Sequence, residues 1–135
     1  MIGYFDGASR GNPGLAGAGA CLMDGGKIIW KRAKYLGVKT NNEAEYAALL
    51  CLLDGARERA VSGIEIRGDS KLVINQINKK WKINFPHLRA LAFRVWELMD
   101  GMDVHLVWVP REENAVADAL SNEAIDGHGD QSEIV

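Results

Sequence analysis

The chain has 135 residues, 47% of them hydrophobic, with a net charge of −2 and a pI near 5.9. This length fits one compact domain, and the weakly acidic balance lacks the basic footprint typical of nucleic-acid binders. No apolar run is long enough to span a bilayer, so we expect no membrane association. The two cysteines, Cys21 and Cys51, lie in apolar segments without metal-ligand spacing, which indicates reduced core residues of a cytoplasmic protein.

The distribution of charge is more informative than its sum. Residues 27–42 contain five Lys or Arg and no acid, and residues 71–96 contain six with again no acid. Two basic tracts beside an acidic remainder could hold a polyanion at the edges of a surface and cations at its centre. For each tract alone, a solvated basic face is an equally good explanation.

The first forty residues predict an antiparallel meander. Residues 2–8 alternate with a period of two and end in the turn at 10–14. A second strand from about Gly17 to Met23 and a third from about Lys27 to Gly37 are joined across the turn at 24–26.

The remaining residues predict helices that alternate with two further strands. Asn41 and Asn42 are candidates for the N-cap of the longest helix, which ends near Ala60. The later elements are a strand around residues 64–66, helices at about 71–78 and 86–100, a strand at 104–109 and a helix at about 113–125.

The order of these elements predicts an α/β fold. Its mixed five-stranded sheet would contain three antiparallel strands and then two parallel crossover strands, flanked by helices. We expect a monomer with a single domain over residues 1–126. The polar, glycine-containing tail at 127–135 is expected to be disordered.

Two acidic residues interrupt segments that are otherwise typical of buried structure. Asp6 lies in a strand expected to be central, beside Gly7, which leaves room for a ligand at the backbone. Glu45 shares a helical stripe with Ala48 and Leu49, and a buried unpaired carboxylate is costly. Glu45 therefore meets a cation or hydrogen-bond donors, unless it is a first-turn residue that bends toward solvent.

Two further carboxylates are open to simpler explanations. Asp69 follows a crossover strand, where ligands bind in open α/β sheets, but it could equally cap the next helix. Asp118 has three polar helical neighbours, a pattern typical of a solvated face: Asn114, Ser121 and Asn122.

A divalent cation is the best reason to gather four carboxylates, because the charges repel one another without one. Ligation by carboxylates alone suits Mg²⁺ or Mn²⁺. A pair of such ions, about 3.5 to 4 Å apart, could activate water and stabilise a leaving oxygen. The sequence therefore points to metal-dependent phosphoryl chemistry.

Five motifs in order resemble those of the type 1 ribonuclease H family, in a short form that lacks the basic handle. They are Tyr4-Phe5-Asp6-Gly7-Ala8-Ser9, Gly11-Asn12-Pro13-Gly14, Thr40-Asn41-Asn42-Glu43-Ala44-Glu45, Gly68-Asp69-Ser70, and Trp108-Val109-Pro110 leading to Glu113-Asn114-Ala115-Val116-Ala117-Asp118. The resemblance covers roughly residues 2–125. It implies a ribonuclease H-like fold and an endonuclease that cuts the RNA strand of RNA/DNA hybrids, leaving 5′-phosphate and 3′-hydroxyl ends.

The resemblance also implies roles for individual residues. The catalytic metal ligands would be Asp6, Glu45, Asp69 and Asp118, with Gly7 beside the two Mg²⁺ or Mn²⁺ ions. Asn12, Asn41 and Asn42 would contact the hybrid near its minor groove, and Thr40 would receive a phosphate of the DNA strand. Ser70 and Lys71 are also expected to bind substrate. Apart from the resemblance, Trp81 could stack on the hybrid while three neighbouring lysines meet phosphates: Lys79, Lys80 and Lys82. A turn role for Asn12, capping by Asn41 and Asn42, and core packing by Trp81 remain open.

The sequence departs from the family pattern at two places. Residues 78–86 are too few to form the longer basic handle of many members. Arg111, in Pro110-Arg111-Glu112-Glu113, stands where a flexible-loop histidine often assists the reaction. We hypothesise that Arg111 handles phosphate. The competing functions are a non-catalytic hybrid-binding module and another two-metal nuclease on the same fold.

Overall fold

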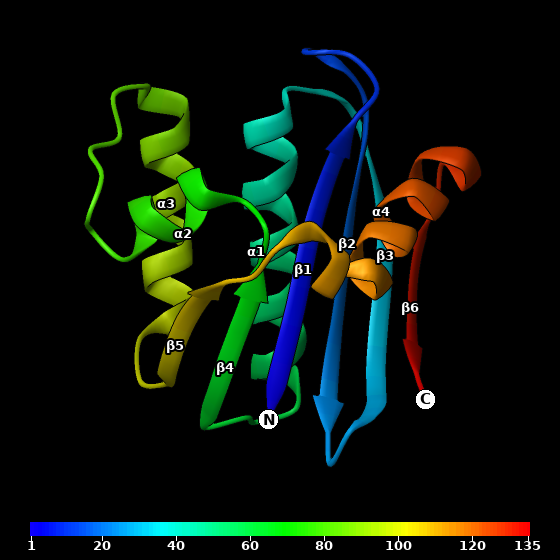
Figure 1. Ribbon diagram of the computed structural model, residues 1–135, viewed down its shortest axis with the longest axis vertical. Helices are drawn as coiled ribbons and strands as arrows, with labels where there is room; N and C mark the ends of the chain where they lie inside the picture. The colour runs from blue at the N-terminus through cyan, green and yellow to red at the C-terminus, as the bar shows by residue number, and fades with distance from the viewer.

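The computed structural model describes residues 1–135 and contains one mixed sheet of six strands in the order β5-β4-β1-β2-β3-β6 (Figure 1). The strands are β1 (Ile2–Ser9), β2 (Gly14–Asp24), β3 (Lys27–Lys39), β4 (Gly63–Gly68), β5 (Asp103–Trp108) and β6 (Asp130–Ile134). β1, β2 and β3 pair antiparallel, while β4 pairs parallel with both β1 and β5. The predicted α/β fold class is confirmed.

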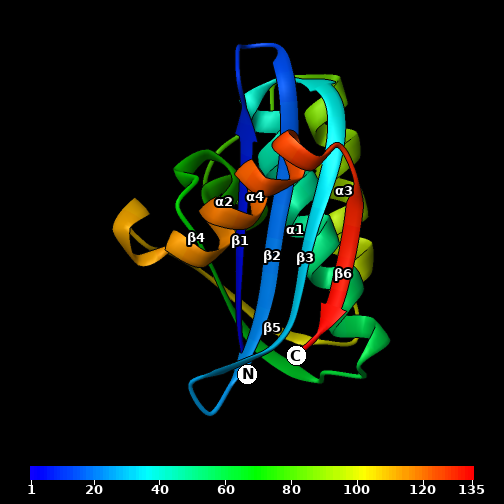
Figure 2. The same ribbon diagram turned by 90° about the vertical axis from the view of Figure 1, so that its right-hand side faces the viewer.

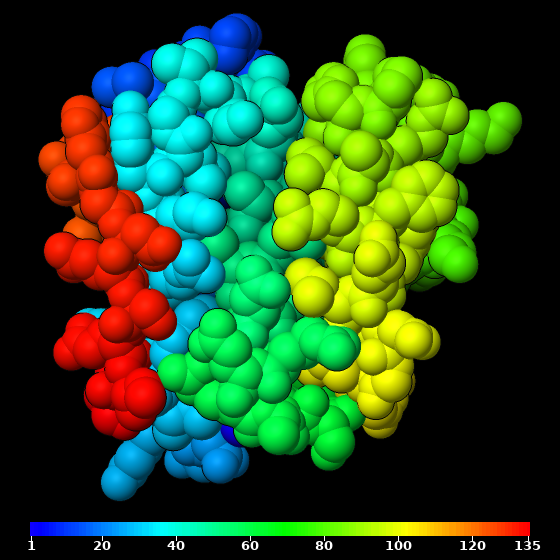
Figure 3. Space-filling model, turned by 180° about the vertical axis from the view of Figure 1, so that it is seen from behind, coloured from blue at the N-terminus to red at the C-terminus, as the bar shows by residue number.

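The helices cover both faces of the sheet. They are α1 (Asn41–Glu58), α2 (Lys71–Ile77), α3 (Pro86–Met99) and α4 (Ala115–Gly127), with a short 3₁₀ turn at Arg111–Glu113 before α4. Figure 2 shows α4 on one face and α1 with α3 on the other. Seen from behind, α1 lies between β3 and α3 (Figure 3). None of these helices has the length and apolar character needed to cross a membrane.

The main core lies between the sheet and α1. The α1 sequence is apolar on almost every side, because the helix is enclosed by the sheet in front and by α3 behind. Phe5 from β1 and Trp30 from β3 are among its largest fully buried side chains. Gly55 in α1 faces the Trp30 ring at a position where a Cβ would collide with it. This contact fixes the position of α1 across the sheet, with its first turn at the end of β1.

On the opposite face, α4 lies unusually close to β2. A Cβ at Gly17 or Gly19 would overlap the backbone of α4, so only glycine permits this approach. The close packing brings the first turn of α4 next to β1. α4 therefore delivers its polar residues to the same end of the sheet as α1.

The expectation that residues 127–135 form a disordered tail is wrong, and so is the count of five strands. α4 continues to Gly127, and β6 then pairs antiparallel with β3. Arg32 donates two hydrogen bonds to the Asp130 carboxylate at 2.9 and 2.8 Å, and Trp30 Nε1 donates to Ser132 Oγ at 2.8 Å. All five β6 residues are exposed, so a polar composition suits an edge strand that has no apolar face to bury.

Removal of β6 by truncation after Gly129 should lower the free energy of unfolding by about 1–3 kcal/mol, because it leaves the buried Trp30 N–H without its partner. The truncated chain should remain folded, since β6 adds nothing to the main core. Urea unfolding measures the change. Equal stability of the truncated and full-length chains would contradict a structural role for β6.

Candidate active site

The candidate active site lies where strands β1 and β4 separate. The β1–β4 ladder covers Ile2 to Tyr4 only, whereas β4 stays beside β5 as far as Gly68. Asp6 lies two residues beyond the end of the β1–β4 ladder, and Asp69 directly follows β4. Both carboxylates therefore face the crevice at the carboxyl ends of neighbouring parallel strands, the usual ligand position in open α/β sheets.

α1 brings Glu45 to this crevice through close contact with Gly7. A Cβ on Gly7 would overlap the backbone of Ala44 and Glu45, so α1 can approach β1 only because residue 7 is glycine. The Gly7 N–H donates a hydrogen bond of 2.6 Å to Glu45 Oε1. Gly7 thus fixes the direction of the carboxylate as well as the position of the helix.

Three of the predicted carboxylates form a cluster. One oxygen each from Asp6, Glu45 and Asp69 lie within 4.8 Å of one another. Asp6 is 6% exposed, and Asp118 reaches the same cavity from α4. The cavity has a volume of about 410 Å³ and is lined by Asp6, Gly7, Ala8, Ser9, Asn41, Asn42, Glu45, Asp69, Ser70, Arg111 and Asp118.

The carboxylates destabilise one another's charged forms. Burial raises the pKa of Asp6 well above its ordinary value, and the negative charges of Glu45 and Asp69 raise it further. Burial also raises the pKa of Glu45, although the Gly7 N–H opposes this shift. A cation in the cluster would favour the ionised forms. Oxygen donors alone, at this spacing and with this burial, fit a hard divalent ion such as Mg²⁺ or Mn²⁺.

A pH dependence follows for the protein in EDTA. The pKa of Asp6 is raised from 3.8 in the unfolded chain to about 10 in the folded protein. Between these two pH values the folded state binds more protons than the unfolded state, so the free energy of unfolding falls as the pH rises. Asp6→Asn removes this group, so its stability advantage over wild type should grow between pH 5 and 8, by at most about 1.4 kcal/mol per pH unit. Urea unfolding across this range measures it, and a constant difference would contradict the prediction.

Four of the predicted substrate-binding residues lie in or beside the acidic cavity. Asn41, Asn42 and Ser70 line the acidic cavity. Asn12 lies next to them, and its Oδ1 accepts a hydrogen bond of 3.1 Å from the Asn41 N–H. Asn41 and Asn42 do not cap α1, because Thr40 is the N-cap and forms a capping box with Glu43. Their side chains are therefore not used as caps.

Lys71 and Trp81 do not line the acidic cavity, whereas Arg111 does. Lys71 Nζ is 4.7 Å from the centre of the Trp108 ring, where the two form a cation–π contact. Trp81 lines a second cavity of about 320 Å³ between α2 and α3. Arg111 is 78% exposed at the rim of the acidic cavity, with Nη2 3.8 Å from Asp118 Oδ1.

The structure does not support a solvated face as the alternative explanation for the polar residues around Asp118. Ser121 is fully buried, because α4 lies close to Gly17 and Gly19 of β2. Asn114 is 1% exposed, and its amide lies against the Phe5 carbonyl of β1. Ser121 Oγ donates to the Asp118 main-chain carbonyl at 2.7 Å, and Asn122 Nδ2 donates to the same oxygen at 3.0 Å. No local pattern marked Ser121 and Asn114, since both are buried against residues about a hundred positions earlier in the chain.

This fold and acidic crevice define a ribonuclease H-like domain, and comparisons with known proteins agree. A family model described as "Reverse transcriptase-like" matches residues 4–124. The chain belongs to this family and is similar over most of its length to ribonuclease H proteins.

Two relatives show how far the sequence similarity extends. The chain is 47% identical to ribonuclease HI of Halobacterium salinarum over 125 residues, which cover 91% of this chain and 63% of that protein. A bifunctional protein of Mycobacterium tuberculosis is 38% identical, and the match covers 90% of this chain and 34% of that protein. The chain thus spans less than two thirds of these relatives' lengths.

Solved structures share the whole fold. The crystal structure of the Halobacterium salinarum ribonuclease H1 superposes with a TM-score of 0.91 at 46% identity, covering 93% of this chain and 97% of that one. LC11 ribonuclease H1, solved in complex with an RNA/DNA hybrid, superposes with a TM-score of 0.89 at 35% identity, covering 94% and 97%.

Proposed function

We propose that this protein is an endonuclease that hydrolyses the RNA strand of RNA/DNA hybrids with two divalent ions, leaving 5′-phosphate and 3′-hydroxyl ends. The observation that carries the proposal is the convergence of Asp6, Glu45, Asp69 and Asp118 on one cavity from four separate elements. The names of its relatives, and the hybrid bound to LC11 ribonuclease H1, support the choice of substrate.

In the proposed mechanism, these four carboxylates hold Mg²⁺ or Mn²⁺. Bound ions would lower the pKa of an attacking water and stabilise the charge on the leaving oxygen. The Gly7 N–H keeps one Glu45 oxygen in a fixed direction, so the other oxygen is free to face an ion. The hydrogen bonds to the Asp118 carbonyl fix the first turn of α4 and with it the Asp118 side chain.

The asparagines beside the cavity suit the sugar edge of a hybrid. Asn41 and Asn42 line the cavity, and their amides can donate to or accept from a 2′-hydroxyl. Asn12 is held against the start of α1 by its bond to the Asn41 N–H. We propose that these three residues place the RNA strand over the carboxylates. Thr40 and Ser70, at the N-termini of α1 and α2, and Lys71 would contact phosphates.

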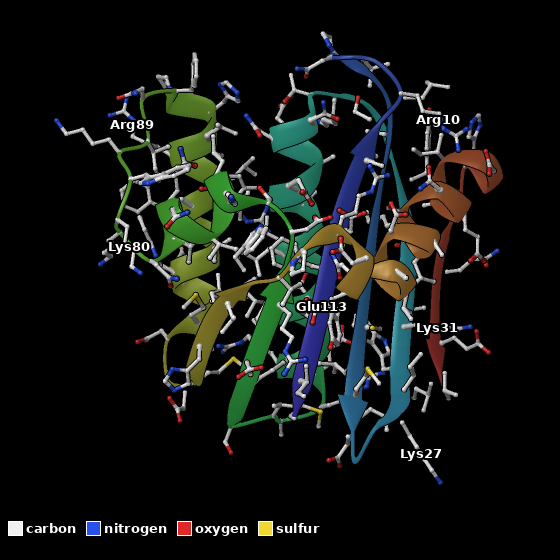
Figure 4. The ribbon with its side chains drawn as sticks, in the orientation of Figure 1. Arg10, Lys27, Lys31, Lys80, Arg89 and Glu113 are labelled. Carbon is white, nitrogen blue, oxygen red and sulfur yellow. The ribbon has the colours of Figure 1, made fainter.

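The surface around Trp81 is proposed to replace the missing basic handle. Only the residues between Ile77 and Pro86 join α2 to α3, yet this segment presents a half-exposed indole among cations. The cavity beside Trp81 is lined by four basic residues and no acid: Lys79, Lys80, Lys82 and Arg89. Figure 4 shows Lys80 and Arg89 on this side of the molecule, on the opposite side of β1 from Arg10. Phosphates and stacked bases are the natural ligands of such a surface.

Arg111 is proposed to handle phosphate at the rim of the cavity. The side chain is exposed and reaches toward Asp118 without a close hydrogen bond, so it can turn to an incoming phosphate. Arg111→Ala should lower kcat/KM about tenfold, which corresponds to the loss of about 1.4 kcal/mol from one charged contact. Arg111→Lys should retain part of the activity. Steady-state kinetics on a hybrid checks this, and unchanged kcat and KM in Arg111→Ala would remove Arg111 from the mechanism.

We propose that the protein acts as a monomer in the cytoplasm, where its two free and buried cysteines would remain reduced. The choice between Mg²⁺ and Mn²⁺ does not follow from the donor atoms, because both ions accept carboxylate oxygens.

The function is tested by offering RNA/DNA, RNA/RNA and DNA/DNA duplexes labelled on each strand, with Mg²⁺ and then with Mn²⁺. The proposal predicts cleavage of the RNA strand of the hybrid alone, and none in EDTA. Binding of the hybrid without cleavage in either metal would indicate a non-catalytic binding module. Cleavage of the DNA duplex would indicate a different two-metal nuclease.

A further inference from the structure

We infer that Asn114 is a positioning residue that holds Asp6 and Asp118 in the arrangement that binds the divalent ion. The inference deepens the proposed function and rests on it. Asn114 is the residue before α4 and is 1% exposed. Its side chain does not cap α4, although asparagine at this position commonly does so.

The Asn114 amide is used to join α4 to β1. Nδ2 donates a hydrogen bond of 2.9 Å to the main-chain oxygen of Phe5, the residue immediately before Asp6. Phe5 lies just past the last pair of the β1–β4 ladder, where β4 has turned away from β1. A side chain therefore supplies a donor to β1 at the point where the crevice opens.

The same residue is bonded to Asp118. The Asp118 N–H donates to the Asn114 main-chain oxygen at 3.0 Å. Asn114 thus connects the backbone beside Asp6 to the backbone of Asp118 through two hydrogen bonds. Since these carboxylates come from opposite ends of the chain, this link sets how far apart they lie.

The other side-chain atom of Asn114 argues against a role in packing alone. Asn114 Oδ1 is buried and has no hydrogen-bond partner, and an unpaired buried polar atom is destabilising. A small apolar residue would avoid this penalty but could not bond to the Phe5 carbonyl. The structure therefore retains an unfavourable group for the sake of one donor beside the metal ligands.

The test measures ion binding separately from cleavage. The melting temperature of wild type, Asn114→Ala and Leu120→Ala is recorded against Mn²⁺ concentration. Leu120 is buried on α4 in an apolar cluster with Cys21, Ala33 and Ala124, so Leu120→Ala loosens the same helix without removing the amide. Asn114→Ala should need about tenfold more Mn²⁺ to reach half of the maximal rise in melting temperature. This factor is at the low end of the loss in metal affinity that follows mutation of a residue supporting metal ligands. Leu120→Ala should need the wild-type concentration.

With a hybrid substrate, Asn114→Ala should require a similarly higher Mn²⁺ concentration for half-maximal rate, with KM for the hybrid unchanged. Equal Mn²⁺ dependence in Asn114→Ala and wild type would overturn the inference, and so would an equal shift in Leu120→Ala. If Asn114→Ala does not fold, Asn114→Ser makes the same comparison, because its hydroxyl is too short to reach the Phe5 carbonyl. Failure of wild type to cleave any hybrid would overturn the proposed function and leave the Mn²⁺ comparison valid.

Discussion

Asp69→Asn should reduce cleavage of the RNA strand by at least about a thousandfold while leaving the fold intact. The substitution keeps the shape of the side chain but removes a charged ligand from a cluster in which three carboxylate oxygens lie within 4.8 Å. Loss of about 4 kcal/mol of transition-state stabilisation, the scale expected for a catalytic ion, gives this factor. Single-turnover cleavage of a hybrid with Mg²⁺ measures the effect.

The same variant should be as stable as wild type in EDTA, or more stable by up to about 1 kcal/mol, because it relieves repulsion within the cluster. Asp24→Asn is the matched control, since Asp24 is exposed in the β2–β3 turn at the far end of the sheet. It should retain full activity. Turnover at the wild-type rate in Asp69→Asn would exclude Asp69 from the chemistry.

Gly7→Ala should destabilise the protein strongly although it adds only one methyl group. The added carbon would overlap the main chain of Ala44 and Glu45, and backbone cannot rotate away as a side chain can. The first turn of α1 must then move from β1, so the Gly7 N–H loses its bond to Glu45. We expect a loss of about 3 kcal/mol or more in the free energy of unfolding.

The folded fraction of Gly7→Ala should also cleave at least about tenfold more slowly, because a displaced Glu45 no longer faces the other carboxylates. Gly127→Ala is the control, since a Cβ at Gly127 meets nothing within 4 Å. Its stability should lie within about 1 kcal/mol of wild type. Chemical denaturation of both variants checks the comparison, and equal stability would show that α1 does not depend on Gly7.

The parts of the fold that depend on local pattern were predictable from the sequence. Alternation in β1, the turn at 24–26 and the apolar run of α1 each specify an element within its own residues. Asp6 and Glu45 stood out because each places a charge in an apolar segment. Their meeting in one cluster confirms the spatial prediction, while the catalytic roles remain proposals.

Two differences between the sequence predictions and the structure come from contacts between distant residues. β6 is a strand because β3 offers it an edge and Arg32 a partner for Asp130, neither of which a polar tail reveals. Ser121 is buried because glycines in β2 admit α4, and Asn114 is buried against the Phe5 carbonyl of β1, so their polar character left a solvated face open as an alternative. The third difference is local. Thr40 rather than its asparagine neighbours caps α1, because Thr40 and Glu43 form a capping box within four residues of sequence.

Calorimetric titration of the free protein with Mn²⁺, in two buffers of different ionisation enthalpy, tests whether the carboxylate cluster binds a cation. Wild type should bind the ion and release protons, because the pKa values of Asp6 and Glu45 are raised in the absence of metal. Asp6→Asn should bind at least about tenfold more weakly, and Asp24→Asn should bind like wild type. Equal Mn²⁺ affinity in Asp6→Asn and wild type would contradict the claim that this cluster exists to hold a cation.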